Sequence, residues 1–477
     1  MTGDEGLEPR LERMLLALVL IVGAALRLIG LNQGLWYDEI ATLVRYVRRP
    51  LIEIVTRFDT QNQHMLYSVL AHGSVQVFGD TAWALRLPAA SFGVASLWAV
   101  WWFGTLVTGR REALLAAALL AVSSHHVWFS QDARGYSMLL FWTLVGSGLF
   151  LRLLQGPVRS RALVFGYGAV MALATWTQVA GGFVVAGHAL VWLVLAVAGR
   201  RGGSAVVREP VLAIVLSGLL TLLLYAPVVP AMITTLAAPG ATGGAAEWKS
   251  PVWFVTEAMR GLARGVPGGW IGLFVAAAVA GLGTLNYLRR SRPVTLVMLL
   301  PGLVTAVVML VTAHNLWPRL FFFATGFAVL IAVRGGFALS EAVFGARGPM
   351  VATVGLVVAS AASAFTVPRI WVPKQDFGAA RAFVEASRQP GDAVVTVDMT
   401  RLPYRDFYPT GWIAADSLTD LAALRPDSGR TWVLYTFPER LRAVDPAMWD
   451  AIQCCFTEAR RFPGTAEGGT IWVMVRG

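Results

Sequence analysis

Long apolar runs constrain this chain more than any other feature of its sequence. Three of them, residues 14–31, 211–229 and 294–313, reach the length of about 17–25 residues that a helix needs to cross a bilayer. A soluble domain usually has about a quarter of its residues charged. Here only 14% of the 477 residues are charged and the mean hydropathy is +0.61. The sequence therefore predicts a polytopic membrane protein.

The net charge of +11 would suit a nucleic-acid partner, but the placement of the arginines argues against one. They gather in short loops between apolar runs, as they do in the cytoplasmic loops of membrane proteins. We therefore expect no nucleic-acid partner, and a multi-pass protein of the inner or plasma membrane with these loops inside. The loops are those of Arg110 and Arg111, Arg159 and Arg161, Arg200 and Arg201, and Arg289, Arg290 and Arg292.

The apolar runs predict an all-α membrane domain of about eleven transmembrane helices. Residues 40–57 and 64–78 would form helices at the outer interface, because the arginine loops all face the cytoplasm only if this stretch makes no net crossing. Arg27 and the acidic residues before the first run indicate a retained span rather than a cleaved signal peptide. The expected spans are 14–31, 88–108, 113–130, 136–154, 162–178, 181–198, 211–230, 269–288, 294–313, 317–336 and 349–368.

The last hundred residues change character and predict a small α/β domain. Residues 378–387 favour a helix, and residues 393–397, 431–437 and 470–475 favour strands separated by Pro, Asp and Gly turns. We expect a membrane domain over 1–370 and an extracytoplasmic α/β domain over 371–477, with the C-terminus facing the periplasm or exterior. The adjacent Cys454 and Cys455 fit a structural role or a vicinal disulfide, and no common zinc pattern.

Five polar groups fall in the loops that this topology puts outside. Each has a plain structural alternative: a solvated acidic pair, an ion pair that caps a helix, an N-cap, or an arginine that snorkels at a helix end. Together they bring carboxylates, which can act as base or metal ligand, to the same surface as arginines suited to phosphate. The groups are Leu35–Glu39, Asp59–His64, Arg86–Pro88, Ser130–Ser137 and His314–Arg319.

The order of these motifs resembles the GT-C superfamily of membrane glycosyltransferases, in the branch of protein O-mannosyltransferases and lipid A aminoarabinose transferases. The resemblance covers roughly residues 20–335. Its motifs are Arg27-Leu28, Trp36–Glu39, His64–Leu66, Arg86–Pro88, Ser130–Tyr136, Tyr225–Pro227 and Pro318-Arg319. Three positions depart from the family pattern: Asp132 replaces a glutamate, the prolines that usually follow His64 are missing, and Gln178 stands where relatives often have histidine.

This resemblance implies an inverting transfer of sugar from a polyprenyl-phosphate donor, with Asp38 as the general base. Glu39 and Asp132 would complete the catalytic carboxylates, and Asp132 would position the acceptor, an arginine or a divalent cation. A metal is an open question, with Asp132 and His64 as its candidate ligands. The phosphate would be bound by Arg86, Arg134 and Arg319, and further site candidates are Tyr37, Asp59, His64, Tyr136 and Gln178. The acceptor could be a lipid, a protein or an envelope glycan.

A different class of membrane protein, a flippase or exporter of a lipid-linked saccharide, would also need many spans and phosphate-binding arginines. Such transporters usually show internal repeats and charged residues inside broken helices at the membrane midplane. The sequence contains no detectable repeat, and its polar motifs crowd the outer loops. A non-catalytic scaffold is disfavoured by the presence of both Asp38 and Asp132. The sequence therefore favours a transferase.

Overall fold

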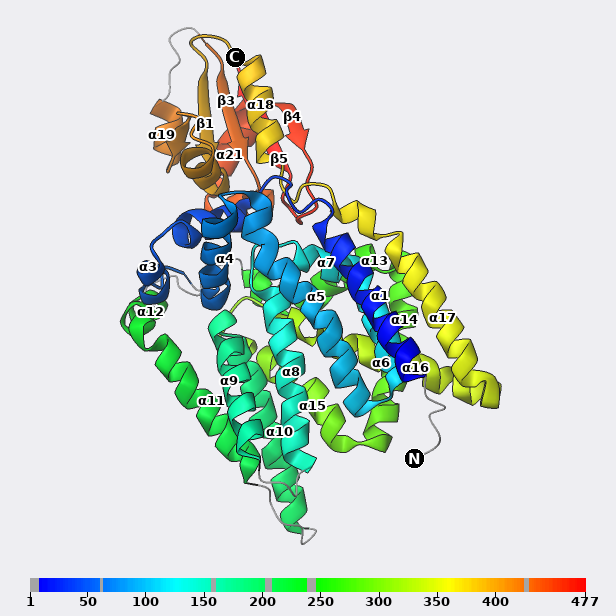
Figure 1. Ribbon diagram of the computed structural model, residues 1–477. Coiled ribbons are helices and arrows are strands. Elements are labelled where there is room, and N and C mark those ends of the chain that lie inside the picture. Colours follow the sequence, from blue (N-terminus) through cyan, green and yellow to red (C-terminus); the bar gives the residue numbers. More distant parts are fainter. Residues whose placement is uncertain (1–7, 61–62, 156–159, 202–207, 238–245, 424–428) are drawn as a thin grey trace.

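A long helical bundle carries a small sheet domain at one end (Figure 1). The computed structural model describes residues 8–60, 63–155, 160–201, 208–237, 246–423 and 429–477. Arg159, Gln61 and Asn62, which belong to the motifs and loops discussed above, lie outside these ranges. The described N-terminal residues begin at the end of the bundle far from the sheet domain (Figure 1).

All eleven predicted spans fall on helices of the bundle. By length and composition, seven described segments could cross a membrane, or eight if the bent pair α6–α7 is one span. The number eleven stays a prediction, because α1 carries charged residues near both ends and α9 has only 17 residues. The helices are α1 (Pro9–Leu28), α5 (Ala82–Val107), α6 (Arg110–Ala121), α7 (Ser124–Ser130), α8 (Tyr136–Gln155), α9 (Arg161–Thr177), α10 (Gly181–Arg201), α11 (Glu209–Tyr225), α14 (Gly269–Arg290), α15 (Arg292–Val311), α16 (Thr325–Phe344) and α17 (Gly348–Ala364).

Hydrogen bonds from Arg27 of α1 stabilise the break between α6 and α7. The two helices bend by 65°, so the last carbonyls of α6 lack partners within the helix. Arg27 is fully buried and donates to the carbonyl of Ala121 (3.2 Å) and to Ser130 Oγ (3.3 Å). Its Nη2 also lies 2.5 Å from His126 Nδ1. The arginine therefore fixes α7, which leads directly into the loop of Asp132.

Short helices fill the end of the bundle beside the sheet domain (Figure 1). They include the two stretches, 40–57 and 64–78, that were expected at the membrane interface. Leu35, Ile40 and Tyr67 of this layer share one hydrophobic cluster with Phe377 and Trp432 of the sheet domain. The elements are α2 (Tyr37–Thr42), η1 (Leu43–Val47), α3 (Leu51–Thr56), α4 (Met65–Phe78), η2 (Ala226–Val228), α12 (Val229–Ala237), η3 (Ala246–Lys249), α13 (Pro251–Gly265), η4 (Pro318–Ala324) and η6 (Val367–Ile370). A further short helix, η5 (Gly345–Arg347), joins α16 to α17 at the opposite end of the bundle.

The sheet domain has five strands in the order β2-β1-β3-β5-β4. β1 runs parallel to β2 and β3, whereas β5 runs antiparallel to β3 and β4. The three predicted strands are present, and Cys454 and Cys455 form a disulfide with each other. The elements are α18 (Phe377–Ser387), β1 (Ala393–Val397), η7 (Asp398–Thr400), η8 (Pro403–Phe407), β2 (Ile413–Ala415), α19 (Leu418–Ala423), β3 (Thr431–Tyr435), α20 (Pro438–Val444), α21 (Pro446–Cys455), β4 (Thr457–Phe462) and β5 (Ile471–Arg476).

Two glycines allow α14 and α16 to approach closely. A Cβ added at Gly335 would lie 1.9 Å from the carbonyl oxygen of Val279, and one added at Gly283 would lie 1.9 Å from that of Ile331. Backbone atoms cannot move aside as a flexible side chain can, so both positions require glycine. Small residues at such crossings are a general means of packing membrane helices.

We expect Gly335→Ala to destabilise the protein by about 1–3 kcal/mol, because the added methyl group forces the two helices apart. The matched control is Gly336→Ala, since a Cβ at Gly336 meets nothing within 4 Å. In that control the alanine should be neutral or slightly stabilising, because it restricts the unfolded chain. Thermal unfolding of the detergent-purified protein measures both effects, and equal melting temperatures for the two variants would contradict the close crossing.

Candidate functional site

The carboxylate of Glu39 is locked in a buried ion pair with Arg86. Glu39 lies in the first turn of α2 and is fully buried. Arg86 of α5 holds it with two parallel hydrogen bonds, Nε to Oε1 (2.7 Å) and Nη2 to Oε2 (2.5 Å). Burial raises the pKa of Glu39, but the charges of Arg86 and Lys374 and the hydrogen bonds to the carboxylate outweigh it and hold the pKa below its usual range.

The remaining donors of Arg86 bind the loop that follows α1. Nη1 donates to the carbonyls of Leu31 (2.9 Å) and Gln33 (2.8 Å), and Nη2 donates to that of Gly34 (3.1 Å). A guanidinium has five N–H groups, and these contacts together with the two to Glu39 use all of them. The structure therefore leaves no N–H of Arg86 for a phosphate, contrary to the role expected from the sequence.

Asp132 lies in the turn between α7 and α8, close to Glu39. It is fully buried, and its Oδ1 accepts a hydrogen bond from Trp36 Nε1 (2.9 Å). The neighbouring backbone N–H of Ala133 donates to Glu39 Oε1 (2.9 Å), which ties the two loops together. Oδ2 of Asp132 is buried without a hydrogen-bond partner among the described residues. Burial raises the pKa of Asp132, against the opposing charge of Lys374.

Lys374, which the sequence did not single out, supplies the second cation. It precedes α18 in the segment that joins the bundle to the sheet domain. Its Nζ donates to the carbonyl of Gln131 (2.8 Å) and lies 3.4 Å from Asp132 Oδ1 and 3.7 Å from Glu39 Oε1. We call Glu39, Asp132, Arg86, Lys374 and the neighbouring Asp38 the carboxylate centre. A signal was present in the sequence: only two of the 39 basic residues are lysines, Lys249 and Lys374.

Asp38 is the least committed carboxylate of this centre. Its Oδ2 lies 3.5 Å from Nη1 of Arg319, at the start of η4, and its side chain is 9% exposed. The side chain of Arg319 is 34% exposed, and its guanidinium lies over the ring of Trp317, 5.1 Å from the centroid. This pair is therefore longer and more open than the pair of Glu39 and Arg86.

His64 and Arg134 lie beside the open pair. The N–H of Gly135 donates to His64 Nδ1 (2.7 Å), and Nη2 of Arg134 lies 3.3 Å from His64 Nε2, so N–H donors face both nitrogens of the ring. Burial, with Arg134 and Arg319 adding to it, lowers the pKa of His64 well below its usual value. Arg134 donates to Thr42 Oγ1 (3.3 Å) and is buried.

Glycine is required at residue 135, because a Cβ there would lie 2.7 Å from Thr177 Cγ2 and 3.1 Å from His64 Nδ1. The absence of a side chain at this position lets its N–H reach the histidine.

The other predicted site residues fall at different distances from the centre. The ring of Tyr136 packs edge-on against His64, with centroids 5.2 Å apart. Tyr37 borders the centre and donates its backbone N–H to Gln375 Oε1 (2.9 Å). Gln178 ends α9 with its Oε1 buried and unpaired among the described atoms. Asp59 is exposed, and no contact within the described chain joins its carboxylate to the centre.

The described residues do not fit a resident metal ion. Within the ranges that the structure covers, no group of three or more His, Cys, Asp or Glu side chains could hold one. Of the two candidate ligands, Asp132 already carries the ammonium of Lys374, and Nδ1 of His64 is occupied by the N–H of Gly135.

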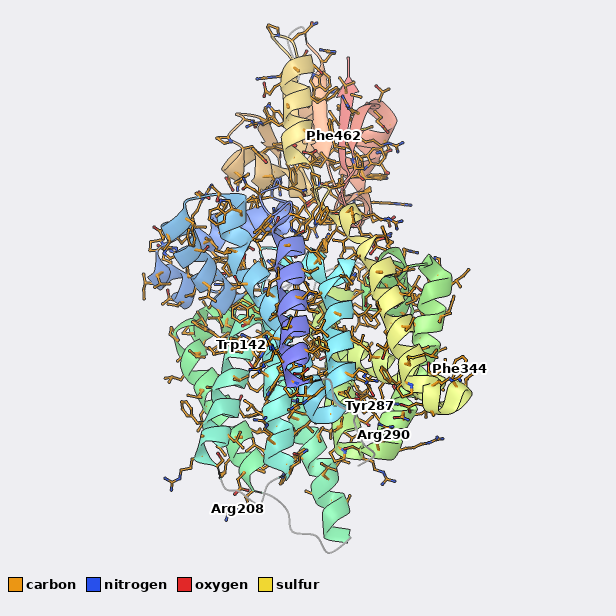
Figure 2. All side chains as sticks on the ribbon, turned by 45° about the vertical axis from the view of Figure 1, so that its right-hand side comes forward. Trp142, Arg208, Tyr287, Arg290, Phe344 and Phe462 are labelled. Carbon is orange, nitrogen blue, oxygen red and sulfur yellow. A yellow bond between two sulfur atoms is a disulfide. The ribbon has the colours of Figure 1, made fainter. Side chains whose placement is uncertain are left out.

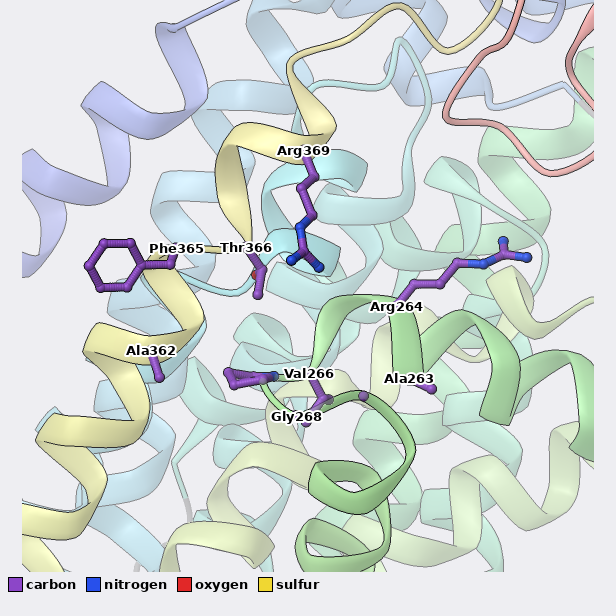
Figure 3. Close-up of a pocket in the computed structure, with 10 residues that line it drawn as sticks. Ala263, Arg264, Val266, Gly268, Ala362, Phe365, Thr366 and Arg369 are labelled. Carbon is purple, nitrogen blue, oxygen red and sulfur yellow. The ribbon is translucent and has the colours of Figure 1, made fainter.

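A pocket of about 430 Å³ lies elsewhere, between α13, α14 and α17 (Figure 3). Arg264 and Arg369 stand at its rim, but Arg264 is already paired with Glu467 (2.9 Å). None of the residues of the carboxylate centre lines this pocket.

Residues 63–230 match the family dolichyl-phosphate-mannose-protein mannosyltransferase. No curated protein sequence matches the chain.

Two solved structures share the fold over nearly the whole chain. One is ArnT from Cupriavidus metallidurans bound to undecaprenyl phosphate, with a TM-score of 0.54, 13% identity and 97% of each chain covered. The other is the Archaeoglobus fulgidus oligosaccharyltransferase in complex with Zn and sulfate, with a TM-score of 0.57, 12% identity, and 96% of this chain and 72% of that one covered. The family match over residues 63–230 and the shared fold together confirm the resemblance to the GT-C superfamily of membrane glycosyltransferases that the motifs indicated.

Proposed function

We propose that the protein is an inverting glycosyltransferase that moves a sugar from a polyprenyl-phosphate donor to an extracytoplasmic lipid, protein or envelope glycan. The observation that carries this proposal is the open pair of Asp38 and Arg319, 3.5 Å apart beside the fully committed Glu39. It joins a potential base to a phosphate-binding cation. The polyprenyl-phosphate donor is supported by ArnT, which was solved with undecaprenyl phosphate, and by the archaeal oligosaccharyltransferase AglB, solved with a dolichol-phosphate.

In this mechanism Asp38 accepts the proton of the acceptor hydroxyl, which requires an approach of about 2.6–3.2 Å. The acceptor oxygen forms its bond to the anomeric carbon from the face opposite the phosphate. The bond between that carbon and the phosphate oxygen breaks, and its electron pair leaves with the polyprenyl phosphate. Arg319 and Arg134 neutralise the charge that develops there. At about 4 Å and an effective dielectric near 20, one opposite charge contributes roughly 4 kcal/mol.

The other members of the centre take structural roles in this proposal. Glu39 and Arg86 hold the loop of Asp38 in place, instead of acting as catalyst and phosphate ligand. Asp132 keeps one buried oxygen, Oδ2, without a hydrogen-bond partner in the described chain. Since a buried unpaired acceptor is unfavourable, this oxygen is suited to accept a hydrogen bond from a second O–H or N–H group of the acceptor and so to hold the acceptor beside Asp38.

The proposed reaction takes place on the outer face of the membrane. Arg208 and Arg290 lie at the end of the bundle opposite Phe462 of the sheet domain (Figure 2). Clustered arginines favour the cytoplasmic side, which would put the sheet domain and the carboxylate centre outside. Because the family match and the shared fold concern glycosyltransferases, we propose a transferase in preference to a carrier of the lipid-linked saccharide.

Asp38→Asn should lower transfer by at least about 100-fold, the usual effect of losing a general base, and leave the melting temperature nearly unchanged. Glu39→Gln should instead destabilise the protein by about 3–5 kcal/mol, because it leaves Arg86 as an uncompensated buried charge. Transfer is measured with a panel of mass-tagged polyprenyl-phosphate sugars and total envelope material. Wild-type turnover by a folded Asp38→Asn variant would remove Asp38 as the base.

Arg319→Ala should weaken the use of donor by about 10- to 100-fold, since partial exposure screens some of the charge interaction. Arg319→Lys should recover only part of the loss, because an ammonium keeps the charge but not the two-pronged hydrogen bonding. The control is Arg347→Ala, since Arg347 is exposed in η5 at the other end of α16. Equal donor titrations for the two alanine variants would refute the phosphate assignment.

A further inference from the structure

The ammonium of Lys374 occupies the place between two carboxylates. It lies 3.4 Å from Asp132 and 3.7 Å from Glu39, and it donates to the carbonyl of Gln131 (2.8 Å). Two indole rings cover it, with Nζ 4.5 Å from the centroid of Trp128 and 5.8 Å from that of Trp36. Only 7% of the side chain is exposed. The lysine is therefore surrounded by acceptors and aromatic faces.

Burying a lysine ammonium costs several kcal/mol unless nearby groups compensate its charge. The two carboxylates, the carbonyl and the aromatic faces provide that compensation here. The charges also balance: Glu39 and Asp132 bring two negative charges, and Arg86 and Lys374 bring two positive ones. Since Arg86 gives its two parallel hydrogen bonds to Glu39, Lys374 is the cation that contacts Asp132 directly.

A divalent ion that bridged the same carboxylates would occupy the space that Nζ now fills. It would bind oxygen at about 2.0–2.6 Å, and the ammonium would repel it from that position. Lysine suits this place better than arginine because its charge is a compact point, whereas a guanidinium is a wide planar fork. In a chain with only two lysines among 39 basic residues, one of them stands here.

We propose that Lys374 is a positioning residue that serves as the fixed cation of the carboxylate centre in place of a divalent metal ion. It holds Asp132 in the orientation that receives the acceptor. The effect on transfer rests on the proposed function, whereas the binding of a cation at this position does not.

The sheet domain thereby becomes part of the catalytic unit. Next to the lysine, Gln375 accepts the backbone N–H of Tyr37 (2.9 Å) and donates to Thr436 Oγ1 (2.9 Å) of the sheet domain. The backbone carbonyl of Lys374 itself accepts the N–H of Ala466 (3.1 Å). The segment that carries the lysine is therefore fastened on one side to α2 and on the other to the sheet domain.

The test uses the full-length detergent-purified protein and three variants. Lys374→Ala removes the side chain beyond Cβ, a fragment that propylammonium reproduces. Lys374→Met keeps most of the stem between the indole rings but lacks the charge and the N–H donors, so it serves if the alanine variant does not fold. Lys249→Ala is the matched control, because Lys249 is the only other lysine and belongs to η3 rather than to the centre.

We expect both Lys374 variants to lose transfer by about 100-fold, the size of effect that a misplaced reacting group produces. Propylammonium should restore part of the transfer activity of Lys374→Ala and raise the melting temperature of that variant. It should have neither effect on the other variants. Tetramethylammonium and sodium chloride at equal ionic strength should do neither, because they offer no N–H donor to Asp132. Wild-type transfer should withstand a chelator.

Three results would overturn the proposal: transfer within twofold of wild type in a folded Lys374 variant, chelator-sensitive wild-type transfer that Mn²⁺ restores, or no response of Lys374→Ala to propylammonium. If no variant and no wild-type sample transfers sugar, the melting temperatures still decide the question. A propylammonium-dependent rise in Lys374→Ala would then support the fixed cation and count against the proposed function alone.

Discussion

The ion pair of Glu39 and Arg86 is the contact on which the rest of the site depends. It joins α2 to α5, and through three backbone carbonyls it also shapes the loop after α1. A buried ion pair adds little net stability compared with apolar packing, but losing one partner is costly. Its value here is geometric. Every N–H of Arg86 is used in a hydrogen bond, so the start of α2 is held in a single position. The adjacent Asp38 is therefore fixed in place although it forms no strong contact of its own.

Two neighbouring carboxylates thus end in different environments. Successive residues of a helix point about 100° apart, so Glu39 and Asp38 face different partners although both begin α2. Glu39 turns inward to Arg86 and the N–H of Ala133, whereas Asp38 faces the half-open Arg319. A positioned base benefits from this arrangement, because Glu39 fixes the position of α2 while Asp38 has only the longer contact to Arg319.

Much of this arrangement was predictable, because apolar runs, arginine loops and strand patterns are local signals. Two strands escaped notice for a physical reason: β2 has only three residues, and β4 reads Thr-Glu-Ala-Arg-Arg-Phe, a mostly exposed edge strand without apolar alternation. In the site, Arg86 and Arg319 look alike in sequence, since each stands close to a proline at the predicted start of a helix, although Pro88 lies inside α5 in the structure. Only tertiary contacts decide that one is saturated and the other open. The sequence did not predict Lys374 as a site residue for the same reason, because its hydrogen-bond partner Gln131 is 243 residues away along the chain.

The charges around the centre fit the direction of the proposed reaction. Glu39 and Asp132 are balanced by Arg86 and Lys374, so this buried half is neutral by itself. Asp38 lies with the partly exposed Arg319 and the buried Arg134, one negative charge against two positive ones, so this half of the centre attracts an anion. A phosphodiester donor has one negative charge, and the released phosphate has about 1.5–2. On the proposed mechanism Asp38 becomes neutral as it takes the proton, while the phosphate gains charge. Arg319 lies 3.5 Å from Asp38, so its positive charge is no longer offset once Asp38 is neutral. It can then stabilise the negative charge that develops on the departing phosphate.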